Sequence, residues 1–236
     1  MKKLALAAVV LVLAVAGGVF WLNQNLDGLV KGAIEKYGSA MTGAKVSVES
    51  VRIAPADGRG VIRGLVVGNP PGFRTAHLAQ VGEIEIAIDL ASLTGAAITV
   101  RKIGVRAAHL IYEKGDAMTN VDAVQKNIAD YLGPSKPGAR DGEGRKLIVE
   151  ELAITGTRAE ASAAFMDGKT VGVKLPDLVL RNIGKAKGGV TPGELGQEIV
   201  GALKARLAAA VSFDALMKSV GGALEKAGGA VRGLFR

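Results

Sequence analysis

The N-terminal segment is the feature that most limits what this chain can fold into. A short basic start, Met1-Lys2-Lys3, is followed at residues 4–22 by nineteen residues without a charged side chain. A helix of that length spans about 28 Å at about 1.5 Å per residue, close to the ~30 Å hydrocarbon core of a bilayer. The sequence therefore predicts a transmembrane helix at the N-terminus.

The two ends of this segment predict its orientation. Lys2 and Lys3 stay on the cytoplasmic side by the positive-inside rule, and two aromatic residues fall where such side chains meet the opposite membrane surface. We therefore expect a single-pass anchor over residues 1–23, with the N-terminus in the cytoplasm and the bulk of the chain across the membrane. The anchor residues include Leu4, Leu11, Leu13, Phe20 and Trp21.

A cleaved signal peptide is the alternative. Ala14-Val15-Ala16 matches the small-residue pattern before a cleavage site, and an acceptable apolar region precedes it. The apolar run does not stop there but continues from Val19 to Leu22, which favours an uncleaved anchor. Both alternatives put the remaining residues outside the cytoplasm.

Composition excludes several classes of function. The chain has no cysteine, so it holds no thiolate zinc site, iron–sulfur cluster or disulfide. Aromatic residues make up only 4% of the chain, which argues against a base-stacking nucleic-acid surface. The net charge of +8 is spread among acidic residues without a run of five like charges. It fits solvated charge or attraction to anionic lipid headgroups better than nucleic-acid binding.

Apolar residues at helical spacing predict short helices beyond the anchor. The segment between the second helix and the next strand, residues 134–145, is rich in Gly and Pro and is expected to form a mobile loop. The expected helices are residues 25–40, residues 120–132 after a cap at Thr119 or Asn120, a helix that opens with Thr191-Pro192-Gly193-Glu194, and an amphipathic stretch over residues 213–235.

Alternation of apolar and polar residues predicts the strands. Residues 83–90, Glu-Ile-Glu-Ile-Ala-Ile-Asp-Leu, alternate without error and give one apolar and one polar face. The alternation slips near Ser50, which suggests a β-bulge, and again around Arg101-Lys102. The expected strands are residues 46–53, 60–67, 83–90, 98–112 (one strand or two), 147–155, 158–165, 170–175 and 179–183, with a tight turn at Asn69-Pro70-Pro71-Gly72.

These elements predict an α+β fold in three parts. An N-terminal transmembrane helix is followed by a mainly antiparallel β-sheet with short amphipathic helices, and then by a C-terminal helical segment. The expected boundaries are residues 1–23 for the signal-anchor, 24–190 for the sheet domain and 191–236 for the C-terminal helices.

Several short motifs follow the anchor in a distinctive order. They are Thr42-Gly43-Ala44-Lys45-Val46-Ser47-Val48, Leu65-Val66-Val67-Gly68-Asn69-Pro70-Pro71-Gly72-Phe73, the strand at residues 84–89, Asp89-Leu90-Ala91-Ser92-Leu93, and Gly115-Asp116 with Asn120. This order resembles the N-terminal region of AsmA-like proteins of bacterial envelopes, over about residues 1–132. Leu175-Pro176-Asp177-Leu178 and Arg181-Asn182-Ile183-Gly184 are similar to short members of that group.

The resemblance implies an anchor in the inner membrane, a curved β-sheet that forms a half-groove in the periplasm, and a role in phospholipid movement or outer-membrane biogenesis. Seven or eight strands at ~4.8 Å spacing give only about 35 Å of groove, too short for this chain to bridge two membranes alone. The groove candidates are Ile84, Ile86, Ile88, Leu90, Val100 and Val105.

A closed core is the alternative for the same apolar face. A sheet normally buries its apolar face under helices, and the helix at residues 120–132 and the C-terminal helices are available as covers. The sequence leaves an open groove and a closed core as equal alternatives.

No catalytic or metal-ligating constellation is predicted. His77 and His109 are not in a metal-ligand spacing, and no nucleophile, base and orienting group occur together. Glu83, Glu85 and Asp89 share one strand face, which is typical of a solvated face, with cation binding as the weaker alternative. We therefore expect no enzyme activity, no cofactor and no metal.

Two kinds of function remain. The first is a lipid-binding module whose partners are the phospholipid bilayer and a bound phospholipid. The second is a structural or assembly factor that binds an envelope protein through the sheet edge or the C-terminal helices.

Overall fold

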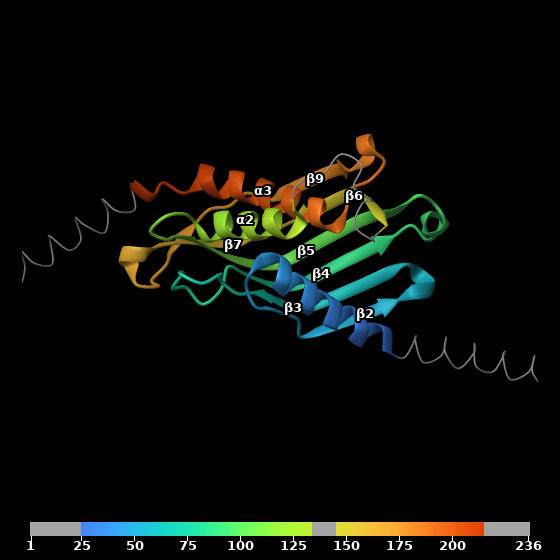
Figure 1. The fold of residues 1–236 in the computed structure, drawn as a ribbon, viewed down its shortest axis with the longest axis horizontal. Coiled ribbons are helices and arrows are strands. Elements are labelled where there is room, and N and C mark those ends of the chain that lie inside the picture. Colours follow the sequence, from blue (N-terminus) through green and yellow to red (C-terminus); the bar gives the residue numbers. More distant parts are fainter. Residues whose placement is uncertain (1–24, 134–144, 215–236) are drawn as a thin grey trace, which may run out of the picture.

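The protein folds into two layers, a sheet and the helices that cover one of its faces. A computed structural model describes residues 25–133 and 145–214 of the chain. Within these ranges, an open, curved sheet of nine strands carries three helices on one face (Figure 1): residues 25–42, α2 (Asn120–Leu132) and α3 (Pro192–Ala210). The α+β class predicted from the sequence is confirmed.

Three of the predicted segments fall wholly or mostly beyond the described ranges. The anchor over residues 1–23 lies outside them, as do most of the loop at residues 134–145 and of the stretch at residues 213–235. No helix in the part of the chain that the structure describes is long and apolar enough to cross a membrane. These three segments stay predictions.

The first strands form an antiparallel meander, and the later ones join it in parallel. β1 and β2 pair with β3, β3 with β4 and β4 with β5, all antiparallel. β6 and β7 pair in parallel with the same edge of β5, and β9 and β8 pair antiparallel with β6 and β7. The strands are β1 (Val46–Ser47), β2 (Ser50–Ala54), β3 (Arg59–Val67), β4 (Ala79–Ile88), β5 (Ala97–Lys114), β6 (Lys146–Ile154), β7 (Arg158–Ala163), β8 (Val171–Val173) and β9 (Leu178–Ile183).

The sheet is therefore mixed: six of its eight pairings are antiparallel, in line with the expected mainly antiparallel sheet, and two are parallel. Antiparallel neighbours can be joined by a tight turn, whereas parallel neighbours need a crossover of a dozen or more residues. α2 lies within that crossover, between β5 and β6. The helix predicted between two strands was itself the sign of a parallel pair.

Strong local signals set the helices where the sequence predicts them. α2 has the predicted bounds and begins with a capping box, in which Thr119 and Asp122 bond each other's backbone N–H. α3 begins in the same way with Thr191 and Glu194. The strand predicted at residues 83–90 instead covers Ala79–Ile88, because Asp89 caps the 3-10 helix η2 (Leu90–Thr94) and ends the strand.

The pairing between strands is interrupted along one line that crosses the sheet. Pairing keeps its register on both sides of this line, but the Gly64–Gly82 pair is skipped between β3 and β4, and the Gly82–Ala107 pair between β4 and β5. At the same height β2 gives way to β1, β6 to β7 and β9 to β8. We call this line the crease; it runs through Glu49, Gly64, Gly82, Ala107, Gly156 and Pro176.

Backbone conformation explains the crease. Gly64, Ala107 and Gly156 have φ angles of 60°, 52° and 62°, in the left-handed region that breaks a regular ladder. The alternation of side chains shifts by one residue at each break. Val81 and Ile84, three residues apart on either side of Gly82, therefore belong to the same apolar core. The apolar face of the sheet continues across the crease for this reason.

The first helix covers one edge of the sheet. Its polar side chains recur every four residues and bond the outer backbone groups of the β1–β2 segment, which blocks pairing with another strand there. The bonds are Ile53 N to Asp27 Oδ1 (2.8 Å), Lys31 Nζ to Glu49 O (3.1 Å), Val48 N to Glu35 Oε1 (2.9 Å) and Val46 N to Ser39 Oγ (2.8 Å).

Candidate functional site

Rows of apolar side chains run across the helix-covered face of the sheet. Register places Ile62, Ile84, Val105, Ile154 and Leu178 side by side on five neighbouring strands. The next row holds Ile86, Ile103, Leu152 and Leu180. Branched side chains pack well on a pleated surface, so each row forms a continuous apolar band.

Two separate groups of helices cover this face from opposite sides. Val30 and Ile34 of the first helix pack over β2 and β3, in a cluster that reaches Ile84 and Ile86. Leu195 and Ile199 of α3 pack over β5, β6 and β9, in a second cluster that reaches the same two isoleucines. Figure 1 shows the first helix and the α2–α3 pair over different strands of the sheet.

A partly exposed band remains between the two covers, and we call it the strip. Its side chains on β4 and β5 are neither fully buried nor fully exposed, whereas Ile154 and Leu178 under the helices are buried. The strip consists of Ile84, Ile86, Ile88, Ile103 and Val105. All of these side chains but Ile88 pack against the core, and all five keep part of their surface exposed to solvent.

The structure places the six groove candidates in three different surroundings. Ile84, Ile86, Ile88 and Val105 lie on the strip. Val100 is 6% exposed and belongs to the closed core. Leu90 is not on the strand at all but in η2, where it is 41% exposed. Ile103 also lies on the strip, opposite Ile86, and is not among the six candidates.

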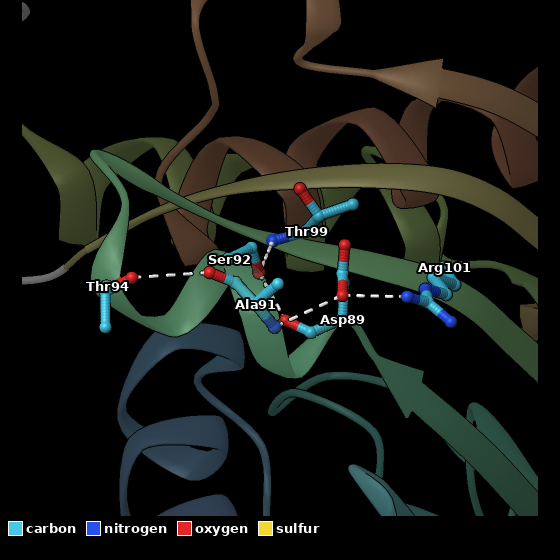
Figure 2. Close-up of polar contacts among 6 residues, drawn as sticks. All are labelled: Asp89, Ala91, Ser92, Thr94, Thr99 and Arg101. Atoms are coloured by element: carbon cyan, nitrogen blue, oxygen red, sulfur yellow. Dashed lines mark hydrogen bonds and ion pairs between the residues drawn. The ribbon is translucent and has the colours of Figure 1, made fainter.

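Polar contacts hold the η2 turn at the end of the strip (Figure 2). The Asp89 carboxylate accepts from Ala91 N (3.2 Å) and pairs with Arg101 (2.8 Å). The Ser92 hydroxyl donates to Asp89 O (2.6 Å) and accepts from Thr99 N (2.8 Å). The Asp89-Leu90-Ala91-Ser92-Leu93 motif therefore builds a fixed turn rather than a chemical site.

The other face of the sheet carries ion pairs instead of a cation site. Three of its acidic side chains have an arginine partner, and in the described ranges no group of three or more His, Cys, Asp or Glu side chains could hold a metal ion. The pairs are Glu83 with Arg63 (2.8 Å), Glu85 with Arg106 and Glu151 with Arg181 (3.0 Å). Because these groups are largely solvated, we assign them little stabilisation and no ligand.

An apolar cavity lies between the sheet and the α2–α3 pair, beneath the helices rather than on the strip. Its volume is about 40 Å³, and its lining comes from Leu78, Leu110, Ile111, Val121, Val124, Val200, Leu203 and Leu207. That volume is close to the space of one water molecule and far below the roughly 300 Å³ at which ligand pockets begin. The cavity is a packing defect and not a lipid site.

The two histidines, far apart in sequence, meet in the structure. His77 Nε2 lies 3.2 Å from His109 Nδ1, and His109 Nε2 lies 3.2 Å from Glu160 Oε1. Burial, and then His109, lower the pKa of His77, while Glu160 acts in the opposite direction. The only sequence signal for this cluster is the rarity of histidine, since its members come from three separate segments.

The buried carboxylate of Glu113, on β5, holds the loop at residues 68–78 against the sheet by hydrogen bonds. Glu113 is 1% exposed and accepts from Arg74 N (2.8 Å), Thr75 N (2.9 Å) and Thr75 Oγ1 (2.6 Å). Asn120 Nδ2 donates to Asn69 Oδ1 (2.9 Å), and Asn69 Nδ2 donates to Thr75 O (2.8 Å). The motifs around Asn69 and Asn120 thus meet in one network whose role is structural.

Comparison with protein-family models returns no match, and comparison with curated proteins returns none either.

Proposed function

We propose that this chain is a membrane-anchored, non-enzymatic module that binds lipid acyl chains along the strip and takes part in phospholipid handling at the bacterial envelope. The observation that carries this proposal is the partly exposed apolar band between two separate helical covers. The resemblance to AsmA-like proteins and the predicted anchor support it, because they would put the strip in the periplasm beside a source of lipid.

The chemistry of the strip suits an acyl chain and little else. Its five side chains are aliphatic and offer no hydrogen-bond donor or acceptor, so they would not fix a polar substrate. Covering their exposed surface removes apolar area from water, which is favourable at roughly 25 cal/mol per Å². The strip ends at Ile88, next to the exposed Leu90 of η2.

A photo-crosslinking residue at position 86 of the full chain tests this proposal. We expect a lipid adduct on irradiation in cell membranes, identified by mass spectrometry. The matched control is position 61, because Val61 is also half-buried but pairs with Glu85, so it points to the ion-paired face. Adducts that join position 86 only to residues of the first helix or of α3, with no lipid, would mean that the face is a closed core.

A substitution separates the two alternatives further. Ile86→Asp should leave the fold intact and lower the yield of lipid adduct at position 84, because water reaches a partly exposed site. Val149→Asp is the comparison, since Val149 is 0% exposed and an unpaired charge there costs several kcal/mol out of a total of ~5–15. If both variants unfold alike, the strip is not open.

A second candidate function is binding of an envelope protein through the edge formed by β8 and β9. Val171 and Val179 on this edge are 43% and 42% exposed, whereas the opposite edge is covered by the first helix. An added strand could pair there. Crosslinks from position 179 to one protein, together with no lipid adduct from position 86, would favour this candidate.

A further inference from the structure

Exposed leucines gather at the end of the sheet where the described chain begins. Leu90 and Leu93 in η2 are each 41% exposed, and Leu29, one turn into the first helix, is 49% exposed. Exposed apolar side chains alone do not distinguish this end, because Met118, Phe165 and Val171 are exposed to a similar degree at the other end. What distinguishes it is the charge around the leucines.

Contacts between the turns establish that these segments share one end. Ile53 N bonds Asp27 beside η1 (Pro55–Asp57), and Ile88 N donates to Gly58 O (2.7 Å) next to η2. On the other side, Arg145 bonds the carbonyls of Leu93 and Gly95. The bridge between Leu147 and Val190 then brings in η4 (Lys185–Lys187). Figure 1 shows these turns together at the right, beside the start of the first helix.

This end, which we call the basal end, is strongly basic. It comprises residues 25–28, 55–59, 88–102, 145–147 and 184–190, which hold seven Lys or Arg and three Asp side chains. The opposite end comprises residues 68–78, 113–119 and 163–171, with three basic and three acidic side chains. The positive charge is therefore a property of the basal end and not of turns in general.

We propose that the basal end rests on a bilayer surface that contains anionic lipid. Leu90 and Leu93 would enter the boundary between headgroups and acyl chains, and the surrounding lysine and arginine side chains would lie at headgroup level, as in amphipathic membrane-surface segments. The predicted anchor ends at residue 23, and the described helix begins by residue 25 at this same end. A link of one residue would hold the basal end against the bilayer.

Contact of the basal end with a bilayer would also set the orientation of the strip. The strip runs from Ile84 through Ile88 toward Leu90, so this end of the strip would lie at the membrane surface. The inference goes beyond the proposed lipid binding, because it assigns an orientation and a second contact surface that would exist even if no acyl chain entered the strip.

A fluorescent label at the basal end tests the proposal. The chain has no cysteine, so Leu93→Cys and Phe165→Cys in the full-length protein each create one labelling site. Phe165 is a matched control because it is 49% exposed at the opposite end. In vesicles of phosphatidylcholine with phosphatidylglycerol, an environment-sensitive dye at position 93 should shift its emission to shorter wavelength and be quenched by nitroxide-labelled lipid. The dye at position 165 should show neither effect.

Charge reversal tests the electrostatic part. Lys185→Glu with Lys187→Glu should reduce the quenching at position 93, and the reduction should be lost in vesicles of phosphatidylcholine alone. Lys169→Glu with Lys174→Glu, at exposed sites away from the basal end, should leave it unchanged. Equal quenching in both double variants would remove the role assigned to the basal charges.

The proposal is overturned if the dye at position 93 reports the same aqueous surroundings as the dye at position 165. Protection of position 93 by a protein or nucleic acid, with no change on adding vesicles, would also overturn it. Loss of lipid adduct from position 86 would leave this result unaffected, so failure of the strip and failure of the basal contact can be told apart.

Discussion

At the scale of single residues, buried polar groups are the part of this molecule that the sequence reveals least. Glu113 follows Leu110-Ile111-Tyr112 at a strand end, where an acidic side chain is usually solvated. Its hydrogen-bond donors come from Thr75, thirty-eight residues earlier, and from Arg74. No local pattern encodes such a pairing, because the partners meet only after the loop and β5 have packed together.

His77 also shows what burial does to a group that looks ordinary in the sequence. It is 7% exposed, and burial followed by the nearby His109 holds its pKa below the usual 6.5. The unfolded chain therefore binds the proton more tightly than the folded chain. Stability due to this group is complete above about pH 6.5 and is lost as the pH falls toward the lower pKa of the folded state.

We predict that the Tm of the full chain falls between about pH 7 and about pH 5, and that His77→Gln makes this fall shallower. Thermal unfolding followed by circular dichroism across this range measures it. Asp122 and Glu160 also have lowered pKa values, but from ordinary values of 3.8 and 4.5, so they act at lower pH. A variant whose Tm falls as steeply as that of the parent would contradict the prediction.

At the scale of helices and strands, the sequence predicts what local signals determine. α2 appears with its predicted bounds because Thr119, Asp122 and an apolar stripe all agree. β5 is one strand rather than two, since the slip at Arg101 is a bulge and does not end pairing. The helix between β5 and β6 indicates their parallel pairing, and the slip near Ser50 marks one point of the crease. The parallel pairing of β7 with β5 and the alignment of the breaks have no such local signal, because they depend on which strands become neighbours.

The crease requires close approach of backbones, which gives it a testable requirement for glycine. A Cβ at Gly82 would lie 2.9 Å from the Ala107 Cβ, and neither atom can move without its backbone. Gly82→Ala should therefore cost about 1–3 kcal/mol, or roughly 2 to 10 °C in Tm for a chain of this size.

The control for that substitution is Gly172→Ala in β8, where a Cβ would meet nothing within 4 Å. This variant should be neutral or slightly stabilising, because alanine restricts the unfolded chain. Tm values of both variants in the same detergent measure the difference. Equal Tm values would mean that the two strands part easily at the crease.

At the scale of the whole molecule, the placement of the domain depends on its first residues. The apolar run through residue 22, with Lys2-Lys3 before it, predicts an uncleaved anchor. Intact mass of the protein purified from membranes should therefore include residues 1–23. A product that begins at Gly17 would contradict the anchor, and the domain would then reach a membrane only through the contacts of its folded part.

The crease gives the sheet a preferred direction of bending. Along this line β3, β4 and β5 each skip a pair, and the other strands give way to one another at the same height. The sheet should therefore bend most easily about the crease. Its two halves would then move relative to each other as nearly rigid bodies. If one half of the sheet is held at a surface, the other half would rotate about the crease. The packing within each half would stay unchanged.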